Sequence, residues 1–513
     1  MEKHTKYTIV LTLIYFALSY IGIHHHEIWY DEAQAWLIAR DSPSLPDLFE
    51  NLKYEGHPFL WHFLLFGITR FTSDPFWMQV FHILLSTTTV FIFLKKAPFN
   101  WLFKMLFIFG YFMIFEYNLI SRNYILSVLL LFLACAFYKD RKHKFLLISL
   151  LLTLTLNVHL FFAVVAISLF LLFLYEYRFE NKFCSAKHFV LGIGVFLIGI
   201  SSLVYQLIPP KDSLFFASKE KISLLDQATH SSSFLAKGLI NIPDFRLSHF
   251  WNTNLIVNFS KPITLLLTLL LLLVPILLFY KNRKVLFFVY SSFLALFLLF
   301  FLVRVHGARF NGVAWIVIVM GLWMSHQLSD ANNPLQKTGA KLKWDKCRNP
   351  IIYTFLLLHF FSGIYAYSMD LKYPFCTSNQ LRDYLKTNQL DTKEIVVISY
   401  EGVSLNAVLQ KKVFFLSKNE RQSFFNLKYD YKIDETESGV ITLLRNYANT
   451  SSGDFIFVSH LNLKSINQKK VWQKIDTNLK IKFLSSCGNS IFEGSDVFVY
   501  EVAKEELKTE NHE

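Results

Sequence analysis

The strongest constraint on this chain is a succession of long stretches without Asp, Glu, Lys or Arg. They lie at residues 7–23, 75–94, 105–115, 123–138, 145–175, 189–210, 262–280, 285–303, 310–329 and 351–369. A helix needs about 20 mostly apolar residues to cross a hydrocarbon core of roughly 30 Å. Nearly all of these stretches meet that need, so we predict a polytopic all-α membrane protein with about 11 transmembrane helices.

The net charge of +13 does not indicate a nucleic-acid partner. The Lys and Arg residues cluster in short loops between apolar stretches, where the positive-inside rule places them. These loops lie at residues 95–104, 139–144, 178–187, 281–284 and 337–348. We therefore expect a multi-pass protein of the bacterial inner (plasma) membrane, with a cytoplasmic N-terminus and an extracytoplasmic C-terminal tail.

This orientation depends on two apolar stretches. Residues 57–71 contain His57, His62 and Arg70, and we expect them to form a helix in the outer interface that does not cross the membrane. Residues 145–175 are long for one helix and short for two. We interpret them as two short helices that meet at the outer surface, because a single crossing would invert every later span.

The tail after about residue 371 differs in character from the preceding chain. Strand-length apolar runs at 395–399, 413–416, 455–458, 481–484 and 497–502 alternate with helix-like segments at 379–386 and 440–447. We predict a transmembrane module at 1–370 and an extracytoplasmic α/β domain at 371–513. The module has a first outer loop at 24–74 and another at 211–261, which is long enough to cover a site. If the tail is exported, Cys376 and Cys487 could form a disulfide.

Candidate catalytic groups gather at the outer ends of the spans. Asp31 and Glu32 follow the first span, where a carboxylate can act as general base toward an acceptor hydroxyl. A lipid-phosphate leaving group would need cationic partners at the same depth. Such partners are available at three other span ends: Arg122, His159, Arg304, His306 and Arg309. The alternative interpretation is that the acidic pair is a solvated helix boundary and the arginines extend to lipid headgroups.

Three motifs in the first part of the chain resemble the GT-C superfamily of membrane glycosyltransferases. They are "WYDEAQAW" after the first span, "EGHPFLWH" farther on, and "SRNYIL" at the start of a later span. The closest resemblance is to the protein O-mannosyltransferase and aminoarabinose (lipid A) transferase group. It covers residues 1–175 by motif and the rest by architecture only.

The resemblance implies roles for individual residues. Asp31 would be the catalytic base with Glu32 beside it, and Glu55 and His57 would match the family's His-Pro segment. Arg122 and Tyr124 would match an Arg-x-Tyr element near the carrier phosphate. The chain departs from the family pattern at Phe59 and Phe310, which replace a Pro and a Tyr. The first outer loop has no Asp-x-Asp motif, so a divalent metal is possible but not favoured, and no cofactor is certain.

The resemblance and the residue pattern together predict a glycosyltransferase. The donor would be a polyprenyl-phosphate sugar, and the acceptor a glycan, lipid or protein at the outer face of the membrane. The main alternative is a flippase or transporter of lipid-linked sugars, for which we would expect repeated halves and ionisable groups at mid-membrane. A third alternative is a non-catalytic scaffold whose tail binds a partner.

Overall fold

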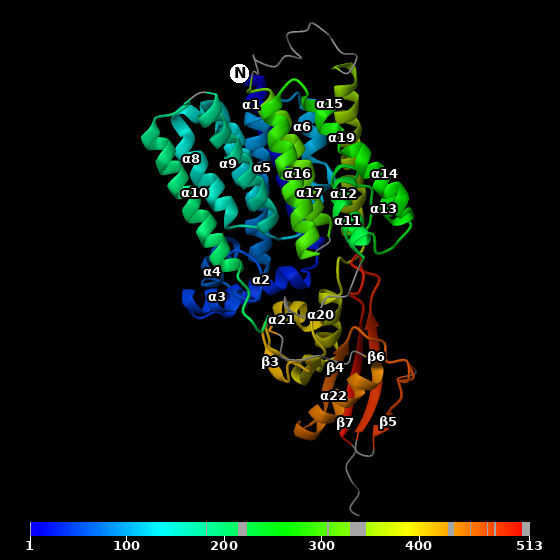
Figure 1. Ribbon diagram of the computed structural model, residues 1–513. Coiled ribbons are helices and arrows are strands. Elements are labelled where there is room, and N and C mark those ends of the chain that lie inside the picture. The colour runs from blue at the N-terminus through cyan, green and yellow to red at the C-terminus, as the bar shows by residue number, and fades with distance from the viewer. Residues whose placement is uncertain are drawn as a thin grey trace, which may run out of the picture.

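The computed structural model describes residues 2–180, 182–213, 223–304, 307–328, 345–428, 436–451, 453–468, 470–476 and 479–504. Helices form most of this part of the chain, and a β-sheet occupies the C-terminal region. In Figure 1 the helices form an elongated body, and the C-terminal domain extends from one end of it. The start of α1 (Glu2–His25) lies at the opposite end of this body.

Eight helical segments of the described chain are long and apolar enough to cross a membrane. They are α1, α5 (Phe76–Lys96), α9 (Leu160–Phe179), α10 (Ala186–Leu207), α14 (Lys261–Leu271) continued by α15 (Val274–Phe279), α16 (Arg283–Val303), α17 (Ala308–Ser325) and α19 (Asp345–Lys372). The apolar part of α17 is 83% buried, whereas that of α10 is only 22% buried. Apolar side chains on the outside of the body are compatible with a multi-pass membrane protein.

The remaining expected spans are shorter helices. Their segments are α6 (Trp101–Ile108), the π-helical turn η1 (Phe112–Glu116), α7 (Tyr124–Phe137), the 3₁₀ turn η2 (Tyr138–Asp140) and α8 (Arg141–Leu156). Because each is shorter than the about 20 residues of a full crossing, the total of about 11 spans stays a prediction. The prediction of two helices in 145–175 is confirmed, because α8 ends at Leu156, α9 begins at Leu160, and the two pack together.

Three short helices separate the helical body from the C-terminal domain (Figure 1). They are α2 (Tyr30–Asp41), α3 (Leu45–Leu52) and α4 (Leu60–Thr69). The apolar helix α4 has 10 residues, a length of roughly 15 Å at 1.5 Å per residue. It is therefore too short to cross a membrane, in agreement with the sequence prediction.

The C-terminal domain is built on one mixed, seven-stranded sheet with the order β3-β2-β1-β4-β7-β6-β5. The strands are β1 (Glu394–Val397), β2 (Val413–Phe415), β3 (Glu420–Gln422), β4 (Phe455–Ser459), β5 (Gln473–Asp476), β6 (Leu479–Cys487) and β7 (Val497–Lys504). Strand β1 pairs in parallel with β2 and β4, and the other pairs are antiparallel. The helical segments are α20 (Ser378–Thr387), η4 (Leu390–Thr392), α21 (Glu401–Leu409) and α22 (Glu437–Thr450).

All five predicted strands and both predicted helices of this domain are confirmed. The sequence analysis missed β3, β5 and α21. The two missed strands are the sheet edges, and their polar, largely exposed residues lack the apolar alternation of a buried strand. Cys376 and Cys487 are buried free thiols, so the disulfide that the sequence allowed is absent from this structure.

The first outer loop and the C-terminal domain share a hydrophobic core. Ile28, Ala33 and Leu37 of the loop are buried in one cluster with Leu381 and Val403 of the domain. The loop 211–261 returns to the helical body through α11 (Leu224–Ser232), α12 (Phe234–Leu239) and α13 (Leu255–Phe259). Both connections place loop residues over the same end of the body.

Candidate active site

Asp31 lies in the first turn of α2. The helix begins here because the Oε2 atom of Glu32 accepts a hydrogen bond of 3.0 Å from the backbone N–H of Trp29, which satisfies a donor that a helix N-terminus leaves open. The side chain of Asp31 remains 22% exposed, whereas that of Glu32 is fully buried. The two neighbouring carboxylates therefore have different surroundings.

Glu32 connects α2 to the turn that carries Arg122. Its Oε1 atom accepts a hydrogen bond of 2.5 Å from the backbone N–H of Ser121. Because both of its carboxylate oxygens are engaged by the protein, Glu32 has no free oxygen for a substrate. These bonds give Glu32 a positioning role between α2 and the Arg122 turn, and its catalytic role stays a prediction.

His26 ties the same carboxylate to the end of α19. Its ring nitrogens lie 3.3 Å from Glu32 and 2.9 Å from Asp370. Burial alone would lower the pKa of His26, but the carboxylates of Asp370 and Glu32 raise it to about 10. The protonated ring therefore joins three segments, and one of them leads directly into the C-terminal domain.

Arg122 lies in the turn between η1 and α7. His82 of α5 holds this turn, because its two ring nitrogens lie 3.0 and 2.9 Å from the main-chain oxygens of Asn118 and Arg122. The Nη1 atom of Arg122 donates to the main-chain oxygen of Asp31, and Nη2 lies 3.7 Å from the Asp31 carboxylate. The arginine side chain is only 6% exposed, so water screens its charge weakly.

Arg309, in the first turn of α17, forms the shorter ion pair, with 3.1 Å between Nη2 and the Asp31 carboxylate. Helix α17 approaches the η1 segment closely at Gly312, where an added Cβ would meet Phe112 and Tyr117 at 2.5 Å. The Tyr117 hydroxyl donates a hydrogen bond of 2.7 Å to the main-chain oxygen of Arg309. The close helix packing thus places the second guanidinium beside Asp31.

Two tryptophans that the sequence analysis did not single out enclose Arg309. Its guanidinium carbon lies 4.7 Å from the ring centre of Trp29 and 5.7 Å from that of Trp251. Trp251 belongs to the outer loop 211–261, and its Nε1 atom donates to Glu116 at 3.0 Å. The loop therefore reaches the site, as its length suggested. No local motif marks Trp251, because its position depends on how the loop folds back.

Two histidines next to the arginines are neutral. The Nε2 atom of His57 lies 3.2 Å from Nη2 of Arg122, and it must accept because arginine can only donate. Burial, followed by the charges of Arg122 and Arg309, lowers the pKa of His57 to about 3. The ring of His159 lies 5.8 Å from that of His57 and 4.6 Å from that of Tyr124. Burial also lowers the pKa of His159.

Glu55 lies at the edge of the cluster. Its Oε1 atom accepts a hydrogen bond of 2.8 Å from Gln34 of α2, which is also bonded to the main chain of Phe425 in the C-terminal domain. Burial raises the pKa of Glu55 to about 7, Asp31 adds to the shift, and Gln34 and Arg122 oppose it. Glu55 therefore changes charge near neutral pH.

Two predicted residues do not join this arrangement in the described structure. Arg304 ends α16, and its Nη2 atom donates to Gln227 of α11 at 3.0 Å, which directs the guanidinium toward the outer loop. His306 lies outside the described residues. The residues that do converge on one site are Asp31, Glu55, His57, Arg122, Tyr124, His159 and Arg309.

The cluster has the chemistry of an anion site. Within the described chain, Asp31 is the only carboxylate that forms an ion pair with Arg122 or Arg309. The Nε atoms of both arginines and the hydroxyl of Tyr124 are buried and have no hydrogen-bond partner there. A phosphate group could accept from all three donors.

This donor set does not fit a divalent metal, because two guanidinium groups repel a cation beside Asp31. Among the described residues, no group of three or more His, Cys, Asp or Glu side chains is arranged to hold a metal ion. His24, His25 and His26 do not converge, since His26 is engaged by carboxylates on either side.

No protein-family model matches the chain, and no curated protein matches it.

Proposed function

We propose that this chain is a membrane glycosyltransferase that transfers a sugar from a polyprenyl-phosphate donor to an acceptor at the outer face of the bacterial inner membrane. The observation that carries this proposal is the partly exposed Asp31 carboxylate between Arg122 and Arg309, beside three buried donors that lack partners. These groups lie at one end of a body of apolar helices, where a lipid carrier and its phosphate would meet the protein.

The charges support a phosphate diester as the donor. The two arginines carry two positive charges, Asp31 neutralises one of them, and Glu55 adds no charge below about pH 7. The neutral His57 and His159 add none. A single negative charge, such as that of a sugar–phosphate–lipid diester, would balance the remainder. Cleavage of the donor leaves a phosphate monoester of greater negative charge, so the same arginines stabilise the leaving group most as the bond breaks.

In the proposed reaction, the acceptor hydroxyl oxygen attacks the anomeric carbon of the donor sugar. A carbon–oxygen bond to the acceptor forms while the bond between the anomeric carbon and the phosphate oxygen breaks. The bonding electrons leave with the polyprenyl phosphate, and the acceptor proton passes to Asp31 as general base. Arg309 and Arg122 shift from Asp31 toward the phosphate as its charge grows, which frees the carboxylate to take the proton.

The wider arrangement we propose is a GT-C-like module of about 11 membrane helices. Its N-terminus would be cytoplasmic, and its C-terminal domain extracytoplasmic. The basic residues Lys95 and Lys96 end α5, which runs away from the C-terminal domain. The positive-inside rule then favours a cytoplasmic location for the end of the body that lies opposite that domain.

The decisive experiment supplies purified protein in lipid nanodiscs with radiolabelled polyprenyl-phosphate monosaccharides and follows release of the sugar from the lipid. We expect wild-type protein to consume one of these donors and Asp31→Asn to be slower by about 10²–10⁴-fold, the usual contribution of a general base. An Asp31→Asn protein that kept more than about a tenth of wild-type turnover would remove Asp31 from this role. If wild type consumed no donor but moved labelled lipid between leaflets in vesicles, a flippase would replace the transferase.

A further inference from the structure

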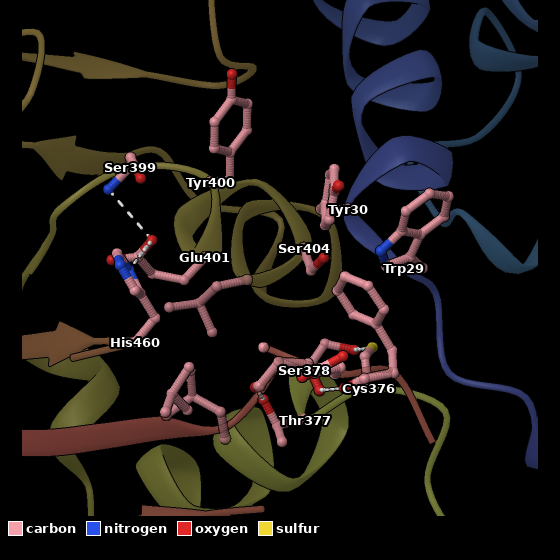
Figure 2. Close-up of a pocket in the computed structure, with 17 residues that line it drawn as sticks. Trp29, Tyr30, Cys376, Thr377, Ser378, Ser399, Tyr400, Glu401, Ser404 and His460 are labelled. Carbon is pink, nitrogen blue, oxygen red and sulfur yellow. Dashed lines mark hydrogen bonds and ion pairs between the residues drawn. The ribbon is translucent and has the colours of Figure 1, made fainter. Parts of the chain in front are cut away.

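A cavity of about 420 Å³ lies between the start of α2 and the C-terminal domain. Figure 2 shows Trp29 and Tyr30 on one side of it and Ser399, Glu401 and His460 on the other. Small-molecule pockets usually measure roughly 300–1,000 Å³. The cavity is therefore large enough for a small ligand, and the reaction proposed above leaves it without a role.

The sheet topology places polar groups in this cavity. Strands β1 and β4 are parallel neighbours, so the residues that follow them, Ser399 to Glu401 and His460, meet at the carboxyl ends of these strands. Ligands of sheets with parallel strands commonly bind outside the carboxyl ends of those strands. The Glu401 carboxylate accepts from the backbone N–H groups of Ile398 at 2.9 Å and Ser399 at 3.2 Å, and it lies 3.4 Å from Nδ1 of His460.

Aromatic rings form the opposite wall. The ring of Tyr30 lies 5.8 Å from those of Tyr400 and Phe492, and Trp29 lies 5.6 Å from Phe492. Such a wall presents flat apolar faces next to polar edges. The C–H faces of a sugar ring can pack against it while the sugar hydroxyls turn toward the polar side of the cavity.

The charges of the cavity exclude other ligand classes. Among the described residues that line it, Glu401 and Glu493 are acidic and none is Lys or Arg. A phosphate or carboxylate ligand would therefore be repelled. A plain alkyl chain would strip water from the carboxylates and hydroxyls without replacing their hydrogen bonds. Neutral hydroxylated ligands and ligands with an ammonium group remain.

The cavity shares a wall with the arginine cluster. Burial raises the pKa of Tyr30 to about 12, with Asp31 adding to the shift and Arg309 and Arg122 opposing it. The Tyr30 hydroxyl is therefore within electrostatic reach of the cluster while its ring lines the cavity. Trp29 also serves both sides, because one neighbour of its ring is Arg309 and another is Phe492. A ligand in the cavity would lie next to the residues that immediately precede Asp31.

We propose that this cavity binds a neutral or amino-bearing sugar unit of the acceptor and presents it to Asp31. The role as acceptor site rests on the proposed function, whereas the binding chemistry follows from the cavity alone. An extended peptide fits less well, because peptides usually add to a sheet edge. The edges here are β3 and β5, and the cavity lies at the ends of the inner strands β1 and β4.

The test offers the full-length protein in nanodiscs to immobilised oligosaccharides of neutral, amino-bearing and carboxylated sugars, and to an extended peptide. We expect retention on neutral or amino-bearing sugars. Two variants should weaken it by about tenfold, since one lost stacking ring contributes up to about 1.5 kcal/mol. They are Tyr400→Ala, which removes part of the wall, and Ser404→Trp, which fills the cavity. Trp472→Ala, which removes a partly exposed ring outside the cavity, should bind like wild type.

The melting temperatures of the same preparations verify that the two cavity variants are folded, and donor hydrolysis without acceptor is measured alongside. Capture that is lost in both variants while hydrolysis persists supports the proposal. The proposal is overturned by capture of only carboxylated sugars or of the peptide, by no capture, or by capture that both variants retain. If sugar capture follows the cavity variants but wild type hydrolyses no donor, the proposed transferase fails and the sugar site stands.

Discussion

The two sides of the Trp29–Tyr30 wall differ in charge. On the side of the helical body, two nearly buried arginines face one carboxylate. On the side of the C-terminal domain, the cavity has two glutamates and, among its described lining residues, no Lys or Arg. One side thus selects for an anion and the other against it. For the transferase proposed above, this difference in charge would keep the anionic donor out of the cavity.

Removal of one guanidinium group should have the largest effect on the arginine side of this wall. Arg309→Gln should raise the KM for the polyprenyl-phosphate donor by about 10–100-fold, the equivalent of roughly 1.5–3 kcal/mol for a charge-assisted hydrogen bond. Sugar capture by the cavity should not change. Arg304→Gln is the matched control, because Arg304 is bonded to Gln227 of the outer loop, and we expect donor kinetics like those of wild type. An equal effect of both variants would contradict the assignment of Arg309.

Glu32 should affect only the arginine side. In Glu32→Gln, an amide N–H₂ replaces one carboxylate oxygen and faces a backbone donor, either Ser121 or Trp29. We expect turnover to fall about tenfold. The free energy of unfolding should fall by about 1–3 kcal/mol, seen as a lower melting temperature. If Glu32→Gln melted like wild type and kept full turnover, the positioning role would be wrong.

Donor binding should depend on pH through the titration of Glu55. Glu55 has a pKa raised to about 7 by burial, so it is neutral below that pH and negative above it. The negative form reduces the positive potential of the arginine cluster. The KM for the donor should therefore rise by about threefold to tenfold above pH 7, the equivalent of about 1 kcal/mol. In Glu55→Gln the change in KM between pH 6 and 8 should be smaller, with only Glu116, among the described residues of similarly raised pKa, left near Arg309. A full wild-type dependence in this variant would exclude Glu55 as its source.

The smallest expected effect concerns His26, which links α2 to the end of α19. The pKa of His26 is raised from 6.5 to about 10, because Asp370 and Glu32 outweigh its burial. A raised pKa in the folded state stabilises the protein fully below about pH 6.5, and this stabilisation is lost as the pH rises through about 10. Wild type should therefore lose more thermal stability between pH 7 and 10 than His26→Gln. His24→Gln, at an exposed neighbour, should follow wild type.

Local sequence pattern was sufficient for much of the fold. The charge-free stretches correspond to apolar helices, and α4 is as short as its interrupted pattern suggested. In the C-terminal domain the apolar runs identified the inner strands β1 and β4. Local sequence pattern was not sufficient for the edge strand β3, where Glu420 and Arg421 are exposed. The pairing of an edge strand depends on its neighbour and not on its own hydrophobicity.

The candidate site was only partly accessible to sequence reasoning. Charged residues at span ends are visible as breaks in apolar runs, which is how Asp31, Arg122 and Arg309 were found together. The same reasoning could not separate Asp31 from Glu32, since the two are adjacent in the chain. Only the backbone N–H groups of Trp29 and Ser121 distinguish them, because they occupy one carboxylate and leave the other exposed.

The apolar helices, the five inner strands and the charged groups at the span ends could all be predicted from the sequence. These properties follow from composition and period along the chain, because burial of apolar surface is a local demand. Only the tertiary structure decided that Arg304 turns toward the outer loop, that Trp251 closes over Arg309, and that the C-terminal domain forms a cavity against Trp29. Those outcomes join residues dozens to hundreds of positions apart, and the packing that joins them leaves no periodic trace in the sequence.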